Sequence, residues 1–195
     1  MIIGITGGTG CGKTTALQAI AQLGGLVIDC DKVYHNLLQT DKNLLNAIDA
    51  RFPNTVHADV LDRKLLGTIV FSDEKALRDL NAITHHAVKE AILQILANCP
   101  DLVAIDAIEL FDSGLGELCD ATVAITAPEE DRVRRLIARD NISREYALMR
   151  IHAQKSESYF REKSDYILEN TGTAAEFLQK CLVFFQKLSI IKENP

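Results

Sequence analysis

The sequence lacks any uninterrupted apolar run of the ~18–20 residues that a helix needs to cross a bilayer. Its N-terminus also lacks the basic segment and the small-residue cleavage site of a secretory signal peptide, and it runs directly into glycines. Neither an internal repeat nor a low-complexity stretch nor a linker interrupts the chain. These absences favour a cytoplasmic protein, and we expect no membrane partner.

The sequence also lacks a cysteine pattern that would form a disulfide framework or bind zinc. The five cysteines are odd in number and widely spaced, and no two fall in a Cys-x-x-Cys arrangement. The histidines, His57 and His152 among them, show no metal-ligand spacing either. We therefore expect reduced thiols in a reducing compartment.

An overall excess of positive charge is missing as well. The formal net charge is −6 at pH 7, which gives no general attraction for nucleic acid, and we expect no nucleic-acid partner. The arginines are instead concentrated in one segment of the chain. Six of the ten arginines lie between Arg132 and Arg150, where only Asp140 and Glu145 oppose them.

A regular alternation of apolar runs and helical patterns is what the sequence does contain. Short apolar runs that end in polar or turn residues predict strands, and the apolar spacing between them predicts helices. Nearly all-apolar strands that alternate with helices indicate a parallel sheet covered on both faces. The predicted strands are 2–6, 26–29, 102–106, 121–125 and 165–169, and the predicted helices outside the middle of the chain are 13–23, 31–38, 42–51, 128–139, 143–155 and 173–190.

The middle of the chain, Asp62–Asn98, has no strand-like run. Its pattern predicts helices that divide around Ser72–Asp73 and again near Ile83–Thr84. A chain of 195 residues suits one large domain with a sizeable core. This helical segment is therefore the best candidate for an insertion that shapes a substrate pocket.

The first predicted strand runs into a loop that fits the phosphate-binding pattern G-x-x-x-x-G-K-S/T at every fixed position. Its four glycines let backbone N–H groups converge on phosphate oxygens at the positive end of the next helix. Lys13 would contact the β- and γ-phosphates, and the Thr14 hydroxyl would hold Mg²⁺. A plain glycine-rich turn would need neither residue. We predict that ATP is bound by Gly8, Thr9, Gly10, Cys11, Gly12, Lys13, Thr14 and Thr15.

Acidic residues follow two of the predicted strands. Asp29 and Asp31 come at the end of the second strand, where a carboxylate can accept a proton from a substrate hydroxyl in front of the γ-phosphate. We favour Asp31 as the general base and Asp29 as its support, with helix capping as the alternative for either. Asp106 ends another strand, and both Mg²⁺ binding through water and a turn role fit it.

Beyond the loop, the segment Gly24–His35 resembles the dephospho-coenzyme A kinases, which carry the pattern Leu-Gly-x-x-Val-Ile-Asp-Ala-Asp-x-x-x-His. The similarity spans nearly the whole chain, from Ile3 to about Leu182. Only the phosphate loop is shared widely with other nucleotide-binding proteins, so the later blocks are what separate this family from its relatives. These blocks are Leu61–Asp73, Ile83–His85, Leu136–Asp140, Arg150–Gln154 and Asp165–Asn170.

The resemblance implies transfer of the γ-phosphate of ATP, with Mg²⁺, to the ribose 3′-hydroxyl of dephospho-coenzyme A, the last step of coenzyme A synthesis. It also implies a three-layer α/β P-loop fold with a five-stranded parallel sheet, a helical substrate-binding insertion and a lid. We expect one domain over residues 1–195, with a core of 1–35, 99–138 and 164–195, a helical region at 36–98 and a lid at 139–163. The oligomeric state is expected to be a monomer or a weak homo-oligomer.

Residue roles carry over from the family by position. Asp31 matches the proposed general base, Lys13 and Thr14 match the phosphate and Mg²⁺ contacts, and Arg139 matches the lid arginine. The planar fork of an arginine can grip phosphate oxygens in two places, and a closing lid can deliver it while excluding water. Catalytic roles are thus assigned to Asp31, Lys13 and Arg139.

The remaining substrate-binding residues are assigned less directly. His35, Arg63 and His85 join Asp31 as substrate-binding residues, while an ion pair for Arg63 and a structural role for His85 fit equally well. Arg132 and Arg135 share a helical face with Arg139 by their spacing, and we expect them to be solvated.

The chain departs from the family pattern at two places. Asp106–Asp112 is Asp-Ala-Ile-Glu-Leu-Phe-Asp where many members have Asp-Ile-Pro-Leu-Leu-Phe-Glu, and His85–His86 stands where they have His-Pro. The first departure introduces a second acid, Glu109, into the substrate region. Two other functions stay open on the sequence: a different nucleoside or nucleoside-monophosphate kinase, and an ATP-binding regulatory protein without transfer activity.

Overall fold

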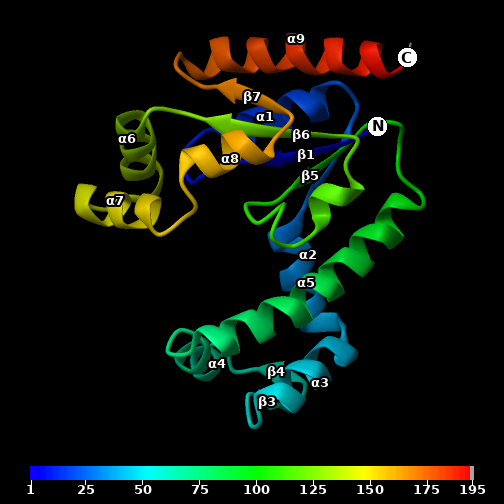
Figure 1. Cartoon of the computed structure of the whole chain (residues 1–195), viewed down its shortest axis with the longest axis vertical. Helices are drawn as coiled ribbons and strands as arrows, with labels where there is room; N and C mark the ends of the chain where they lie inside the picture. The colour runs from blue at the N-terminus through cyan, green and yellow to red at the C-terminus, as the bar shows by residue number, and fades with distance from the viewer. Residues whose placement is uncertain (194–195) are drawn as a thin grey trace. The chain divides into compact units, whose positions relative to one another are not determined.

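The computed structural model describes the backbone of residues 1–193 and the side chains of residues 1–188. The chain forms two compact units, whose elements are labelled in Figure 1. The sheet unit comprises Met1–Ile28, Cys99–Phe111 and the chain from Leu115 onward. The helical unit comprises Asp29–Asn98 and Asp112–Gly114.

A parallel sheet of five strands, in the order β2-β5-β1-β6-β7, is the centre of the sheet unit. β1 lies in the middle, where Ile3 is in register with Ala104 of β5 and Ala121 of β6. The sequence predicted all five strands, and the predicted α/β fold class is confirmed. The strands are β1 Ile2–Thr6, β2 Leu26–Asp29, β5 Val103–Asp106, β6 Ala121–Thr126 and β7 Tyr166–Glu169.

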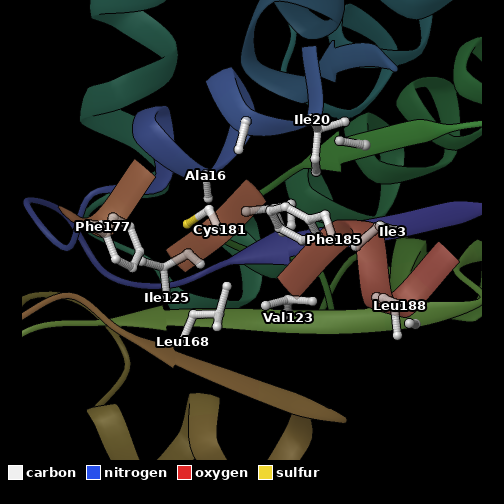
Figure 2. Close-up of a cluster of buried hydrophobic side chains, with 14 of the residues drawn as sticks. Ile3, Ala16, Ile20, Val123, Ile125, Leu168, Phe177, Cys181, Phe185 and Leu188 are labelled. Carbon is white, nitrogen blue, oxygen red and sulfur yellow. The ribbon is translucent and has the colours of Figure 1, made fainter. Parts of the chain in front are cut away.

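Helices and connecting segments pack on both faces of the sheet, and its strands are therefore buried. α1 and α9 lie against the same face and enclose the main hydrophobic core with β1, β6 and β7 (Figure 2). No helix in the described part of the chain is long and apolar enough to span a bilayer. The helices of the sheet unit are α1 Lys13–Gln22, α6 Glu129–Asp140, α7 Arg144–His152, α8 Glu157–Lys163 and α9 Ala174–Glu193, with a 3₁₀ turn, η1, at Leu115–Leu118.

The opposite face of the sheet is covered by the chain that follows β5. A Cβ on Gly4 of β1 would lie 2.7 Å from a methyl carbon of Leu110 and 2.9 Å from the sulfur of Cys119. α8 packs against β6 as well (Figure 1). The sheet is therefore the middle of three layers, and residues that follow its strands gather at one edge.

Phe185 is expected to be a major contributor to the stability of the sheet unit. Its ring is 0 % exposed and lies between α1 and the sheet (Figure 2). We expect Phe185→Ala to lower the free energy of unfolding by about 3–5 kcal/mol, because it removes buried apolar area and leaves a cavity. Denaturant unfolding would measure the change. Val183→Ala on the same helix, at a side chain 40 % exposed, should change stability by less than about 0.5 kcal/mol.

The helical unit has its own apolar core, formed mainly by side chains such as Leu45, Ile48, Phe52 and Leu66. A two-stranded antiparallel hairpin, which the sequence did not predict, lies between α3 and α4. The elements are α2 Cys30–Thr40, α3 Lys42–Arg51, β3 Val56–His57, β4 Val60–Leu61, α4 Arg63–Val70 and α5 Glu74–Leu96.

The predicted division near Ile83–Thr84 is wrong, because α5 continues through it. The Thr84 hydroxyl donates to the carbonyl oxygen of Leu80 at 3.0 Å, so its polar group is satisfied within the helix. The other predicted division, at Ser72–Asp73, is confirmed. There the Asp73 carboxylate accepts from the N–H of Lys75 at 2.7 Å and caps α5.

Candidate active site

The loop between β1 and α1, Gly7–Gly12, takes a shape that depends on glycine. Gly7, Gly10 and Gly12 have φ angles of 133°, 76° and 104°, which residues with a Cβ rarely adopt. Gly12 is the N-cap residue of α1, and no side-chain hydrogen bond caps the helix there. The positive end of the α1 dipole therefore meets the loop without a side-chain cap, which suits an anion.

Side chains from two distant segments lie close to two glycines of the loop. A Cβ on Gly8 would lie 2.4 Å from Nη2 of Arg132, and a Cβ on Gly12 would lie 2.2 Å from Nδ2 of Asn170. Real Cβ contacts are essentially never shorter than 3.0 Å. A side chain at either position would therefore displace the Arg132 guanidinium or the Asn170 amide from the loop.

Side chains from beyond the loop bind its backbone near Thr9. The Nε of Arg132, on α6, donates to the Thr9 carbonyl oxygen at 2.9 Å. The Thr9 N–H donates to Oε1 of Gln154, just after α7, at 2.7 Å. The backbone N–H and the backbone carbonyl group of Thr9 are thus both bound by side chains more than a hundred positions away in the sequence.

The next two carbonyl groups of the loop are bound in the same way. Nη1 of Arg135 donates to the carbonyl oxygens of Gly10 and Cys11 at 3.2 and 3.3 Å. Nδ2 of Asn170, just after β7, donates to the Cys11 oxygen at 2.9 Å. The prediction that Arg132 and Arg135 are solvated is therefore wrong, because the helix face they share packs against the loop.

These contacts identify four residues near the loop that sequence reasoning did not place there. Gln154 and Asn170 lie in two of the blocks that carry the family resemblance, and this was the available signal for them. For Arg132 and Arg135 the only signal was their spacing of three on one helical face.

Lys13 and Thr14 open α1 directly after the loop. The Lys13 ammonium donates to the Gly7 carbonyl oxygen at 3.0 Å and is half-buried, so it lies folded over the loop. The Thr14 side chain is exposed. Asp106 ends β5 and is in register with Ile5 of the neighbouring β1, close to where the loop begins.

The oxygen groups of Thr14 and Asp106 fit Mg²⁺, which prefers oxygen ligands and keeps several waters. No group of three or more His, Cys, Asp or Glu residues within the described chain could hold a metal by itself. The residues present therefore suit a cation that is held mainly by the phosphates of a bound nucleotide.

The thiol of Cys11 lies inside the loop and is only 2 % exposed. Burial raises its pKa above the ordinary value, and it outweighs the opposing charge of Lys13. The thiol therefore stays protonated and is a weak nucleophile in the folded protein.

Arg139 lies in the last turn of α6 and is oriented by the acid that follows it. Its Nε and Nη2 donate to the two carboxylate oxygens of Asp140 at 2.6 and 2.9 Å, and Nη1 of Arg150 donates to the same carboxylate at 2.5 Å. These bonds hold the pKa of Asp140 well below its usual range. The Arg139 side chain is 59 % exposed, so it remains accessible to a phosphate group.

In the helical unit, Asp29 and Asp31 lie at the start of α2 and have different partners. Asp29 caps the helix, accepting from the Lys32 N–H at 3.0 Å and pairing with the Lys32 ammonium at 3.0 Å. Burial would raise the pKa of Asp29, but the bonds to Lys32 hold it below its ordinary value. Asp31 is exposed, and its carboxylate makes no hydrogen bond or ion pair with other described residues. The capping alternative therefore applies to Asp29.

His35 joins Asp31 to Arg63 through its two ring nitrogens. Nδ1 lies 2.6 Å from the Asp31 carbonyl oxygen, and Nε2 lies 3.1 Å from Nη2 of Arg63. Because arginine can only donate, Nε2 must accept, so Nδ1 carries the proton and donates to Asp31. His35 thus orients the Arg63 guanidinium.

The structure therefore gathers the predicted residues into two groups. Lys13, Thr14 and Asp106 lie at or next to the phosphate loop of the sheet unit, and Arg139 lies further along α6 of the same unit. Asp31, His35 and Arg63 are connected within the helical unit. His85 is half-buried on α5 of that unit.

A glycine loop of this pattern, placed between the central strand of a parallel sheet and a helix, defines the chain as a P-loop nucleoside triphosphate-binding protein. A model of the dephospho-CoA kinase family matches residues 1–176. The chain belongs to this family.

Individual relatives agree with the family match. A dephospho-CoA kinase of Latilactobacillus sakei is 36% identical over 176 residues, 88% of this chain and 87% of that protein. The crystal structure of TT1252 from Thermus thermophilus is 33% identical with a TM-score of 0.80, covering 100% of this chain and 98% of the other. A dephospho-CoA kinase structure from Campylobacter jejuni is 30% identical with a TM-score of 0.71, covering 98% of each chain.

Proposed function

We propose that this chain transfers the γ-phosphoryl group of ATP to the 3′-hydroxyl of the ribose of dephospho-coenzyme A. The observation that carries the proposal is the extent of the family match, since residues 1–176 include the helical unit as well as the phosphate loop. A match confined to the loop would have supported nucleotide binding alone. The extent therefore favours this transfer over a different acceptor and over a non-catalytic ATP-binding protein.

The nucleotide is held by Gly8–Thr15 in this proposal. The N–H groups of the loop and the Lys13 ammonium surround the phosphates, where they stabilise the charge that develops during transfer. The Thr14 hydroxyl would hold Mg²⁺ directly, and Asp106 would hold it through water. When bound, Mg²⁺ neutralises part of the phosphate charge.

Asp31 acts on the acceptor. Its carboxylate takes the proton of the ribose 3′-hydroxyl as that oxygen forms its bond to the γ-phosphorus, and ADP leaves with the electrons of the broken P–O bond. Arg63, which His35 orients, binds phosphate oxygens of the acceptor, with His85 as a further contact. The exposed Asp31 carboxylate supports this role.

Residues 139–163 form the lid. Its closure brings Arg139 to the phosphates and excludes water from the transfer. Arg139 begins this movement in contact with Asp140, so a phosphate oxygen replaces a carboxylate oxygen as its partner. The enzyme works in the cytoplasm as a monomer or a weak homo-oligomer.

A direct assay tests the proposed reaction. Purified protein with ATP and Mg²⁺ is given dephospho-coenzyme A, a panel of nucleosides and nucleoside monophosphates, or coenzyme A, and ADP release is measured with mass spectrometry of the acceptor. We expect turnover of dephospho-coenzyme A only. Coenzyme A is the matched control, because its 3′ position already carries phosphate. Turnover of the panel alone, or none with any acceptor, would contradict the proposal.

A further inference from the structure

The carbonyl oxygens of three consecutive loop residues, Thr9, Gly10 and Cys11, all accept hydrogen bonds from side chains outside the loop. Arg135 contributes to two of the three and Asn170 to one. In an exposed loop such carbonyl groups are ordinarily satisfied by water or by local turns, whereas no residue of Gly7–Gly12 is exposed.

These bonds determine where the N–H groups of the loop point. The loop has no cis peptide bond, and in a trans peptide the C=O and N–H groups point in opposite directions. A carbonyl group that is held toward the protein therefore directs the N–H of the next residue away from it. The N–H groups turned outward in this way belong to Gly10, Cys11 and Gly12.

Among the described residues, these N–H groups have almost no partners. The Cys11 N–H makes a long turn bond of 3.3 Å to the Gly8 carbonyl oxygen, and the N–H groups of Gly10 and Gly12 bond to no other described residue. They are thus poised to donate to an anion on the side of the loop away from Arg135 and Asn170.

We propose that Arg135 and Asn170 are positioning residues that hold the phosphate loop in its anion-binding conformation before the nucleotide arrives. The inference rests on the proposed use of ATP. A loop with four glycines in eight residues has many conformations to lose on binding. Side chains that fix it in advance lower this entropic cost and so raise the affinity for the triphosphate.

The placement of both residues supports this role. Asn170 is 4 % exposed and lies where a Cβ on Gly12 would overlap its amide nitrogen, so it is in close contact with the loop. Nη2 of Arg135 also lies 3.4 Å from the Asn170 carbonyl oxygen, which links the two positioning residues. Both act through the backbone of the loop.

Affinity measurements on Arg135→Met test the proposal. Because a hydrogen bond from a charged group is stronger than one between neutral groups, we expect roughly 10-fold or more weaker binding of Mg²⁺–ATP by calorimetry. Inorganic tripolyphosphate should lose affinity by the same factor, because the loop contacts only phosphates. The KM for dephospho-coenzyme A should not change. Arg135→Lys, which can still reach one carbonyl oxygen, should recover part of the affinity.

Arg134→Met is the matched control. Arg134 is the neighbouring residue of the same helix, but its guanidinium pairs with Asp131 at 2.7 Å and is largely exposed. The variant loses the same charge without touching the loop, so its affinity for both ligands should stay within about twofold of the wild type. An equal loss in both variants would attribute the effect to net charge and overturn the proposal.

Asn170→Ala provides an independent test, which also holds if Arg135→Met does not fold. We expect its affinity for ATP and its affinity for tripolyphosphate to fall by the same factor. Unchanged affinity in both Arg135→Lys and Asn170→Ala, or a loss for ATP without a loss for tripolyphosphate, would overturn the proposal. The binding measurements are made without an acceptor. Their outcome therefore does not depend on which acceptor the protein phosphorylates.

Discussion

Asp31→Asn is expected to lower kcat for phosphorylation of dephospho-coenzyme A by ~10² to 10⁴ while leaving ATP affinity unchanged. Asparagine has the same shape as aspartate but cannot accept the proton of the attacking hydroxyl. Asp31 is exposed and lies in the helical unit, whereas the loop proposed to bind ATP belongs to the sheet unit. Steady-state rates and nucleotide affinity, measured on the same preparation, would separate the two effects.

Asp41→Asn is a suitable control for this experiment. Asp41 is the N-cap residue of α3, where its carboxylate accepts from the N–H groups of Asn43 and Leu44 at 2.8 and 3.2 Å. Asparagine caps helices about as well, so the control loses a carboxylate of the helical unit without losing stability. A kcat of Asp31→Asn equal to that of the control would remove Asp31 from the mechanism.

Lys13→Ala is expected to impair both nucleotide binding and turnover. The Lys13 ammonium carries a full positive charge and lies on the loop, 3.0 Å from the Gly7 carbonyl oxygen. We expect ~10- to 100-fold weaker ATP binding from the loss of a charged hydrogen bond. We also expect kcat to fall by on the order of 10²-fold, because the charge stabilises the transition state. Calorimetry and steady-state kinetics would measure the two losses.

The control for Lys13 is Lys42→Ala. The Lys42 ammonium pairs with Asp59 at 2.6 Å, both side chains are well exposed, and the pair lies in the helical unit. Its removal should change neither ATP affinity nor kcat, since exposed pairs contribute little. Full activity of Lys13→Ala would show that the loop works through its backbone alone.

The strands and most helices of this fold were predictable because their signals are local. Each strand is a short apolar run, and outside the helical middle of the chain such runs alternate with helical patterns. The β3–β4 hairpin was missed because the two residues of its turn, Ala58 and Asp59, have positive φ angles of 50° and 63° without the glycine that ordinarily marks such a turn. Helix α8 was missed because it has only seven residues.

The candidate site was predictable to a similar degree. The phosphate loop is encoded in eight consecutive residues, so its place between β1 and α1 followed from the sequence. Its partners were not predictable from spacing. Asn170 lies 159 positions from the Cys11 carbonyl group that it binds, and only the folded sheet brings the two together. Helical periodicity likewise shows that Arg132 and Arg135 share a face, but not what this face contacts.

The glycines of the loop have a consequence for protein engineering. At Gly8 and Gly12 the space left by the missing side chain is filled from the protein side, by the Arg132 guanidinium and the Asn170 amide. A substitution at either glycine would displace these groups even if the bound ligand tolerated it. Any redesign of the phosphate loop should therefore vary the loop, α6 and the segment after β7 together.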